Sequence, residues 1–392
     1  MATRRVLLAQ AAFTPFERIE NAAVAVDGGS IAWVGPAARL PEEFAGAERI
    51  DLAGCTLVPG FVDIHIHGGN GRTAGESPEA LESVAAGLAR QGTTAFLPTL
   101  GGVADFEKLV EQVRMVEANM RSVRSWARVI GIHLEGPFLN PDPRSRGSQN
   151  VDAMRTPDAG EFTRLYEASQ GTLRYMTIAP ELPGALAVIE RMREFGVVPS
   201  AGHTVASYEE MDLAIAAGLR SVTHTYNGMP PMHHRNPGAV GAALTRRELS
   251  AELIGDGQHV SAVAMRVLYN AKGADGITLV TDNTRWAGMP NGRYPSPSGR
   301  VVVKEEFRCY VEGGSLAGSV MPMNFMVKTV MESTGCSLGE ALRMASYNPA
   351  RLIGAGRSKG SLEPGKDADL AALDGDLNVR FTMVEGSVVH RS

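Results

Sequence analysis

Eight short apolar segments, most of them followed by an amphipathic helical stretch, constrain the fold of this 392-residue chain more than any other feature. We expect strands at 61–67, 94–99, 129–135, 175–181, 197–203, 221–225, 251–256 and 277–282. The expected helices between them include 78–91, 105–120, 182–195 and 207–217. Eight strand–helix units over about 220 residues predict a closed parallel (β/α)8 barrel of the α/β class. An open doubly wound sheet is the main alternative, but no Gly-x-Gly-x-x-Gly motif follows the first of these strands.

The two ends of the chain differ from this pattern. Near the N-terminus, short strands are expected at 6–12, 23–26 and 31–34, the last two joined by an Asp-Gly-Gly turn at 27–29. The C-terminus repeats the pattern, with strands expected at 370–373, 381–384 and 387–389. Because neither end is long enough to bury a core of its own, we expect residues 1–55 and 355–392 to form one small β-sandwich domain. The barrel domain would then span residues 56–354.

Charge and cysteine content narrow the class of protein. Lys and Arg total 38 against 43 Asp and Glu, a net charge of −5, which argues against nucleic acid or an anionic membrane surface as a partner. No apolar run approaches the ~20 residues of a membrane-spanning helix. The three cysteines, Cys55, Cys309 and Cys336, are far apart and imply neither a disulfide framework nor a cysteine-based zinc site. The apolar run at 6–12 is short for a secretion signal, so we expect a cytoplasmic protein.

Histidines are concentrated in the expected barrel, where eight of the nine lie between positions 65 and 259. Asp63, His65 and His67 follow one another at period two on the first barrel strand, so they share one face of it. Two imidazoles at i and i+2 near a strand end can ligate one metal ion. Taken alone, the pair fits equally well with two buried, hydrogen-bonded histidines.

The other strand ends favour the metal. Glu135 ends the third expected strand, His203 the fifth and Asp282 the eighth, and His224 lies in the sixth. Barrel enzymes keep their active sites at these carboxyl ends, and buried carboxylates require cationic partners. Imidazole together with carboxylate suits zinc or iron(II), and also cobalt or manganese. The sequence therefore predicts a divalent metal centre.

Several motifs together resemble the N-acetylglucosamine-6-phosphate deacetylase family of the amidohydrolase superfamily. They are Pro-Gly-Phe-Val-Asp-Ile-His-Ile-His-Gly at 59–68, His-Leu-Glu-Gly-Pro-Phe at 133–138, Gly-His-Thr at 202–204, Thr-His-Thr-Tyr-Asn at 223–227 and Thr-Asp at 281–282. The similarity extends to the tail, at 348–350 and 360–373. It covers the whole chain, and the combination is specific although each segment alone is weak.

The resemblance implies a set of metal ligands. Glu135, His203 and His224 would hold the ion found throughout the family, and His65 and His67, with Asp282 and a bridging Glu135, would hold a second. The centre would therefore take one or two ions per subunit. Many two-metal hydrolases on this barrel bridge their ions with a carboxylated lysine on strand four, but no lysine occurs between positions 108 and 272. Glu135 is the natural substitute.

The resemblance also implies a reaction and a substrate. Metal-activated hydroxide would attack the acetamide of N-acetylglucosamine 6-phosphate, with Asp282 as general base and then general acid. His259 would polarise the carbonyl. Asn227 and Gly228 would hold the phosphate, together with Arg235 reaching across the interface of a homodimer. His133 is a candidate support for Glu135, whereas the neighbouring His233 and His234 are expected at the surface.

Two departures from the family leave the substrate open. Gln149 stands where the family typically has a substrate-binding histidine, in a loop at 140–150 that is longer than usual. Arg285 and Trp286 replace small residues after Asp282. The alternative is a deacetylase of the same superfamily acting on another N-acetyl or N-acyl compound, such as a different or unphosphorylated amino sugar. An inactive sugar-phosphate-binding protein is disfavoured because no ligand is lost, and a zinc deaminase because no glutamate follows His203.

Overall fold

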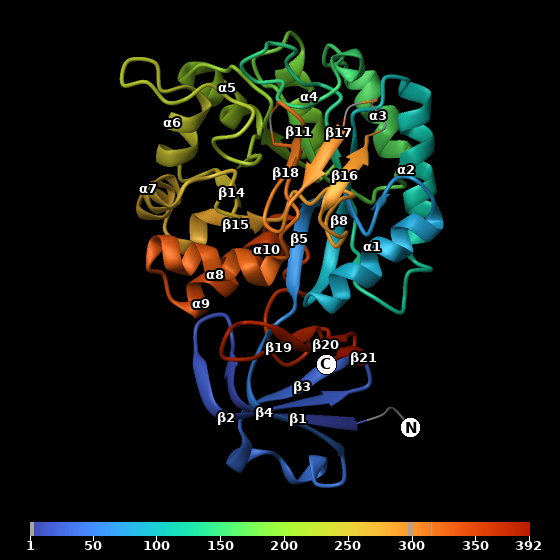
Figure 1. The fold of residues 1–392 in the computed structure, drawn as a ribbon, viewed down its shortest axis with the longest axis vertical. Coiled ribbons are helices and arrows are strands. Elements are labelled where there is room, and N and C mark those ends of the chain that lie inside the picture. Colours follow the sequence, from blue (N-terminus) through green and yellow to red (C-terminus); the bar gives the residue numbers. More distant parts are fainter. Residues whose placement is uncertain (1–3, 297–298, 300, 315) are drawn as a thin grey trace.

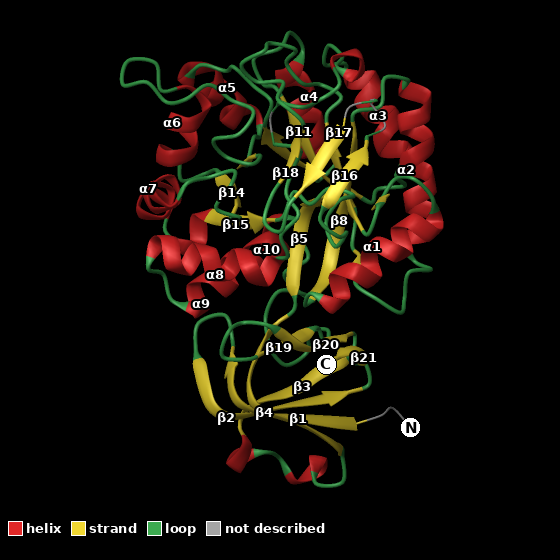
Figure 2. Ribbon diagram, viewed as in Figure 1, coloured by secondary structure: helices red, strands yellow, loops and turns green. Residues whose placement is uncertain are grey.

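The computed structural model describes residues 4–296, 299, 301–314 and 316–392. They form a barrel surrounded by helices and a separate β-sheet domain that contains both ends of the chain (Figure 1, Figure 2). Consecutive strands of the barrel sheet are parallel, in the order β15-β14-β13-β12-β11-β10-β8-β5. Their bounds are β5 (Phe61–Ile66), β8 (Thr93–Gly101), β10 (Ile132–Glu135), β11 (Leu173–Ile178), β12 (Val198–Ala201), β13 (Ser221–Val222), β14 (Ser250–Ile254) and β15 (Ile277–Val280). The short β9 (Arg128–Val129) also pairs with β8. The predicted eight-stranded barrel is confirmed.

The barrel closes where its first and last strands meet. The backbone N–H of Asp282, just past β15, donates to the carbonyl of His65 on β5 at 2.8 Å. Ile66 and Asn283 add an isolated parallel bridge. Asp63 strengthens this seam, because its buried carboxylate accepts hydrogen bonds from the side chain and backbone N–H of Thr281. The seam therefore fixes Asp282 relative to the histidine strand.

Helices follow most of the barrel strands, and several of them begin at capping side chains that the sequence supplies. The α-helices are α1 (Pro78–Arg90), α2 (Phe106–Met120), α3 (Ala159–Ala168), α4 (Ala185–Glu194), α5 (Tyr208–Ala217), α6 (Gly238–Thr245), α7 (Ala262–Lys272), α8 (Met323–Thr334), α9 (Leu338–Leu342) and α10 (Asn348–Leu352). Ser77 and Asp105 cap α1 and α2, and Ser207 forms a capping box with Glu210 at α5. The four helices expected from the sequence are present as α1, α2, α4 and α5. None of the described helices is both long and apolar enough to cross a membrane.

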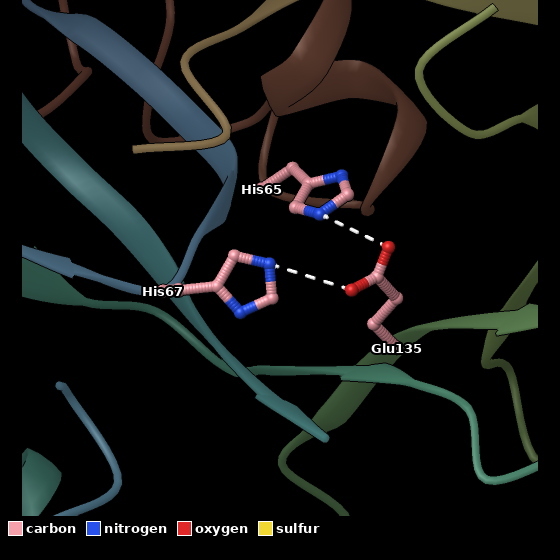
Figure 3. Close-up of side chains that lie close together, drawn as sticks. All are labelled: His65, His67 and Glu135. Atoms are coloured by element: carbon pink, nitrogen blue, oxygen red, sulfur yellow. Dashed lines mark ion pairs between the residues drawn. The ribbon is translucent and has the colours of Figure 1, made fainter. Parts of the chain in front are cut away.

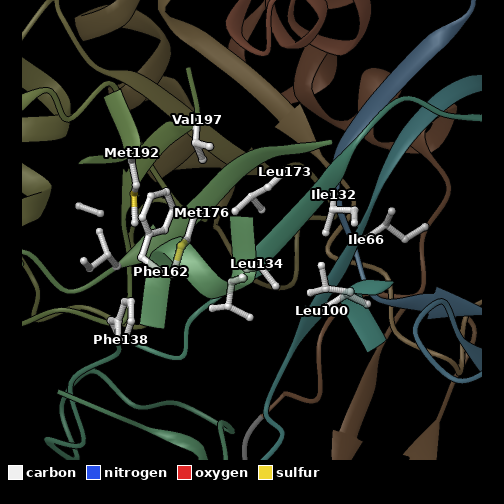
Figure 4. Close-up of a cluster of buried hydrophobic side chains, with 14 of the residues drawn as sticks. Ile66, Leu100, Ile132, Leu134, Phe138, Phe162, Leu173, Met176, Met192 and Val197 are labelled. Carbon is white, nitrogen blue, oxygen red and sulfur yellow. The ribbon is translucent and has the colours of Figure 1, made fainter. Parts of the chain in front are cut away.

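Apolar side chains on the outer faces of the strands pack against the helices. Figure 4 shows Leu134 and Met176 from the sheet in the same buried cluster as Phe162 of α3 and Met192 of α4. The alternation of β10 places Ile132 and Leu134 in this cluster and leaves the intervening side chains, His133 and Glu135, on the other face of the strand, toward the barrel interior. The core thus fixes which residues reach the interior.

The β-sheet domain combines strands from both chain ends, as predicted, but in one continuous sheet. Its order is β21-β20-β19-β4-β1-β2-β3. The strands are β1 (Arg4–Phe13), β2 (Arg18–Asp27), β3 (Ser30–Pro36), β4 (Glu48–Pro59), β19 (Leu370–Leu373), β20 (Val379–Val384) and β21 (Ser387–Arg391). The strands of the two chain ends are joined because β4 pairs with β1 along most of its length and with β19 at its end. One apolar cluster, which includes Leu7, Val24, Leu57 and Phe381, spans both sets of strands.

An additional three-stranded antiparallel sheet follows β15, and the sequence pattern did not predict it. It comprises β16 (Gly292–Pro295), β17 (Val301–Lys304) and β18 (Cys309–Val311). Its strands are only three or four residues long, too short to stand out in the sequence as the expected barrel strands did. A further small hairpin joins β6 (Gly68–Gly69) and β7 (Arg72–Thr73) after β5.

Candidate metal centre and active site

Side chains from four barrel strands meet around the carboxylate of Glu135. Two groups of three residues place their ligand atoms within 4.8 Å of one another. The first is Glu135 with His203 and His224, and the second is Glu135 with His65 and His67. Glu135 belongs to both groups, which is the geometry required of a bridging carboxylate. All of these residues were predicted as ligands from the sequence.

The first half of the centre is formed by His203 and His224. Their Nε2 atoms lie 3.0 and 3.1 Å from Oε1 of Glu135 and 3.1 Å from each other. The Nδ1 atoms lie 2.8 Å from the carbonyl of Ser145 and 3.1 Å from that of Asn227, respectively. Because a carbonyl can only accept, each Nδ1 carries the proton and each Nε2 of a neutral ring keeps its lone pair. Both lone pairs therefore point to the space beside Glu135.

The second half lies on β5, and Figure 3 shows His65 and His67 pointing toward Glu135. Nε2 of His65 is 3.7 Å from Glu135 and 3.6 Å from Asp282. Nε2 of His67 is 3.4 Å from Glu135 and 3.3 Å from Asp282. The Nε2 atom of His65 is buried and has no hydrogen-bond partner among the described residues. An unpartnered buried nitrogen facing two carboxylates fits a cation between them.

Electrostatics at the cluster also favour a cation. Burial lowers the pKa of His65, but the carboxylates of Glu252 and Asp282 outweigh this effect and raise the pKa to about 9. Burial likewise opposes the rise of the His67 pKa to about 10, which Asp282 and Glu135 cause. The pKa of Glu135 is well below its usual range because hydrogen bonds from His203, His224 and His67 outweigh its burial. Buried carboxylates thus need positive charge here, and a divalent metal ion can take the place of these protons.

Three residues of the cluster have left-handed backbone conformations. The φ angles are 46° at His203, 31° at His224 and 47° at Asp282. Such conformations are uncommon for residues with a Cβ, cost roughly 1–3 kcal/mol each and concentrate at active sites. They occur where the chain turns away at the ends of β12, β13 and β15.

Glu252 is a site residue that the motif analysis missed. It lies in the middle of β14 with no exposed surface, and its Oε2 accepts hydrogen bonds from Nδ1 of His65 at 3.0 Å and from the backbone N–H of His224 at 2.9 Å. The signal for it was present in the sequence, because a glutamate within an apolar strand has to face a polar interior.

His133 is not a ligand and does not contact Glu135 through a hydrogen bond. Its two ring nitrogens are each 3.0 Å from a threonine hydroxyl, of Thr99 and Thr177. The ring packs edge-on against His65, with centroids 4.6 Å apart. His133 therefore supports the neighbouring histidine by packing.

A cavity of about 550 Å³ opens onto the cluster. Its lining includes the candidate catalytic and substrate-binding residues Asp282, His259, Asn227, Gly228 and Gln149. Val302, Val311, Leu316 and Ala317, from the additional sheet and the segment that follows it, form an apolar part of the wall. The small sheet thus shapes the pocket opposite the metal ligands.

His259 is held by a carboxylate. Its Nδ1 is 2.7 Å from Asp256, which also accepts the backbone N–H groups of Gln258 and His259. Burial lowers the pKa of His259, but the hydrogen bond and charge of Asp256 outweigh it, so the pKa is raised. His259 is thus suited to present a positively charged N–H to the pocket through Nε2.

Gln149 lies against the metal ligands. Its amide donates to Oε2 of Glu135 at 2.5 Å. Glu181, another residue whose role the sequence did not reveal, fixes this region by accepting hydrogen bonds from the side chains of Asn140 and Thr204 and from the backbone of Val205. It therefore joins the loop that carries Gln149 to the segment after His203.

The residues after Asp282 are held within the protein. Arg285 donates to Glu76 at 2.8 Å and to the carbonyl of Gly71 at 3.2 Å. Trp286 is nearly buried and stacks on Tyr294, with ring centroids 5.3 Å apart. Both line the cavity. The charge of Arg285 is thus already paired, whereas the indole changes the shape of the pocket.

Arg235 is the one predicted substrate contact that lies away from the lining described for the cavity. It is exposed, and its guanidinium contacts the neighbouring His234 at 2.9 Å. Exposure of His233 and His234 agrees with their expected surface position. Arg235 therefore does not form part of this pocket.

Comparison with known proteins defines the class. Residues 56–389 match the Amidohydrolase family. The chain is 36% identical to the N-acetylglucosamine-6-phosphate deacetylase of Lysinibacillus sphaericus, with 88% of each chain covered. It is 35% identical to the N-acetylgalactosamine-6-phosphate deacetylase of Escherichia coli O157:H7, covering 85% of this chain and 87% of that one. A solved structure of the Mycobacterium smegmatis N-acetyl-D-glucosamine-6-phosphate deacetylase, in complex with N-acetyl-D-glucosamine-6-phosphate, superposes with a TM-score of 0.91 at 32% identity and 99% coverage of both chains.

The chain therefore belongs to the amidohydrolase family and is a hydrolase acting on an amide. Within that family it groups with the deacetylases of N-acetylated amino sugar phosphates, as the sequence motifs indicated.

Proposed function

We propose that this enzyme hydrolyses the acetamide of N-acetylglucosamine 6-phosphate to give glucosamine 6-phosphate and acetate. The observation that carries the proposal is the content of one cavity, where the ligand cluster, a carboxylate at Asp282 and an imidazole at His259 face the same space. The named reactions of relatives at 33–37% identity support the same substrate class.

The ligand set fits one or two divalent cations per subunit. Imidazole with carboxylate favours zinc or iron(II), followed by cobalt or manganese. When bound, such a cation supplies a water molecule acidified enough to act as the nucleophile near neutral pH.

Asp282 is positioned to move the proton. Its carboxylate lines the cavity beside His67, and the seam to β5 fixes its backbone. An amine anion is a very poor leaving group, so a proton has to reach the departing nitrogen. Asp282 accepts the proton of the attacking water and delivers it there. Opposite it, His259 donates from Nε2 to the carbonyl oxygen, where negative charge develops.

Phosphate recognition is proposed for Asn227, Gly228 and Arg235. The first two line the cavity, whereas Arg235 is exposed outside it, so we propose that Arg235 completes the pocket of the partner in a homodimer. A sugar phosphate substrate and three unpaired, buried cysteines are consistent with a cytoplasmic enzyme.

A second candidate is deacetylation of another N-acetyl compound, of which N-acetylgalactosamine 6-phosphate is the best supported because of the Escherichia coli relative. Gln149 beside Glu135 and Trp286 in the pocket wall favour an altered sugar preference.

Acetate release from four compounds tests both candidates: N-acetylglucosamine 6-phosphate, N-acetylgalactosamine 6-phosphate and their unphosphorylated forms. The assay uses zinc-loaded protein and is repeated with iron(II). We expect fast turnover of N-acetylglucosamine 6-phosphate only. Preference for the galacto epimer selects the second candidate, and equal turnover with and without phosphate rejects the phosphate roles. No acetate from any of them with either metal contradicts both candidates.

A further inference from the structure

Glu252 connects the two halves of the ligand cluster. Its Oε2 accepts the Nδ1–H of His65, a ligand of the second half, and the backbone N–H of His224, a ligand of the first. Its other oxygen, Oε1, is buried and has no hydrogen-bond partner among the described residues. Glu252 is fully buried inside the barrel, and it forms an ion pair with His65 at 3.0 Å.

Packing alone does not account for a carboxylate at this place. The cross-strand neighbour of Glu252 on β15 is Thr278, and this residue is also fully buried. Neutral hydroxyls occupy the same interior: that of Ser200 is hydrogen-bonded to Thr223, and that of Tyr175 contacts Ser200 and Ser221. Neutral side chains therefore fill the interior around Glu252 without difficulty, whereas a half-satisfied carboxylate is costly to bury.

The contact with His65 determines which nitrogen of that ring is free. A carboxylate only accepts hydrogen bonds, so Nδ1 of His65 has to carry the proton. In the neutral ring, Nε2 then keeps its lone pair, and it lies 3.6 Å from Asp282 and 3.7 Å from Glu135. His67 differs, because its side chain is 25% exposed and its ion pairs, with Glu135 and Asp282, are formed through Nε2.

We propose that Glu252 is a positioning residue for the metal ion at His65 and His67. It holds His65 in the tautomer and orientation that direct Nε2 toward Glu135 and Asp282. This inference rests on the proposed function, since it requires an ion at His65 and His67. It goes beyond the ligand set by making occupancy of the second position depend on a residue that touches neither ion nor substrate.

The test is zinc binding by intact protein, measured by competition with a chromophoric chelator and by elemental analysis. Glu252→Gln keeps the size of the side chain and removes its charge. We expect one of the two ions to bind 10–100-fold more weakly, the usual effect of losing such an outer partner, and the other to bind as in the parent. Thr278→Val is the matched control, because it alters the cross-strand neighbour at the same depth, and it should retain both ions at parental affinity.

A double-mutant cycle with His65→Ala separates positioning from general damage. If Glu252 acts through His65, adding Glu252→Gln to His65→Ala weakens zinc binding no further. Additive losses, parental affinity in Glu252→Gln, or an equal loss in Thr278→Val would each overturn the inference while leaving the two-metal centre in place. Fewer than two ions in the parent protein at saturating zinc would instead reject the two-metal form of the proposed function, and this inference with it.

The parent protein also offers a readout that needs no variant at Glu252. In zinc-loaded protein labelled with ¹⁵N-histidine, His65, assigned by its absence in His65→Ala, should show a proton on Nδ1 and zinc on Nε2. The reverse assignment would contradict the proposed role even if the Glu252→Gln protein failed to fold.

Discussion

The two halves of the ligand cluster achieve the same geometry by different means. In one half, backbone carbonyls of Ser145 and Asn227 hold the rings of His203 and His224. In the other, the side chain of Glu252 holds His65, and the ring of His67 is partly exposed. Carbonyls are positioned by the path of the chain, whereas a carboxylate contributes only if that particular residue is present.

Tight local packing explains why the first half depends on the fold. Gly228 has a φ of 60°, and a Cβ there would lie 2.9 Å from Nδ1 of His203 and 3.1 Å from the carbonyl of Ser145. Only glycine permits this close approach of the two loops. Because both histidines of this half are buried and doubly held, we expect it to bind a metal ion more tightly than the half containing His67.

The largest predicted effect comes from removing one histidine of each half in turn. His203→Ala should lose the tightly bound ion and lower the occupancy of the other, because Glu135 then loses the partner that orients it. His67→Ala should retain one ion per subunit. Elemental analysis after dialysis against limiting zinc measures both. Equal metal content in the two variants would contradict the difference between the halves.

Asp282→Asn tests the residue that adjoins the second half and that we propose as general base and acid. We expect kcat to fall by about 10²–10⁴-fold, the usual contribution of general acid–base catalysis, with at least the ion of the first half retained. The asparagine keeps the backbone seam to β5, so thermal stability should change little. Turnover near that of the parent would exclude Asp282 as the residue that carries the proton.

The residues that could be predicted from the sequence are those whose place follows from strand periodicity. His65, Glu135 and Asp282 were assigned because polar residues at the carboxyl ends of barrel strands have to meet, and the structure brings them together. Both chain ends were likewise expected to form one domain. The long pairing of β4 with two partners was not, because strand register depends on contacts between segments about 300 residues apart.

Residues that act through side-chain contacts were not identified in the sequence. Glu252 and Glu181 belong to no motif, and their roles depend on which loops lie beside them. The small sheet β16–β18 also escaped prediction, since its strands are only three or four residues long. Local sequence thus identified the candidate ligands, and the three-dimensional arrangement was needed to identify what orients them.

Arg235→Ala examines whether the pocket needs a second subunit. A charge-assisted contact is worth about 1.5–3 kcal/mol, so KM for a phosphorylated substrate should rise by about 10–150-fold, with little change for the unphosphorylated sugar. Parallel kinetics on the two sugars measure this difference. As a control, His234→Ala alters the same exposed loop and should leave the preference for phosphate intact. An equal loss on both sugars would reject phosphate contact by Arg235.

The smallest predicted effect concerns His259. The carboxylate of Asp256 holds its ring, as the carboxylate of Glu252 holds that of His65. Strand β14 supplies Glu252, and Asp256 follows just past its end. The raised pKa of His259 means that pairing with Asp256 stabilises the folded protein fully below the unfolded pKa of about 6.5, and that this contribution is lost as pH rises through the folded pKa. Protonated His259 is also the form that would donate to the substrate carbonyl in the proposed reaction.

In Asp256→Asn, burial is no longer outweighed by a negative charge, so the pKa of His259 should fall. The basic limb of the profile of kcat/KM against pH should therefore move to lower pH. Near neutral pH, kcat/KM should fall by about fivefold, which corresponds to the difference of ~1 kcal/mol between a charged and a neutral hydrogen bond. Metal content should stay unchanged, because Asp256 contacts His259 and backbone N–H groups of its own loop. A uniform loss at every pH would mean that Asp256 only shapes this loop. A shifted basic limb with full metal content would show that β14 and the turn after it supply two carboxylates with different roles. Glu252 would fix the orientation of His65, and Asp256 would keep His259 protonated as a hydrogen-bond donor.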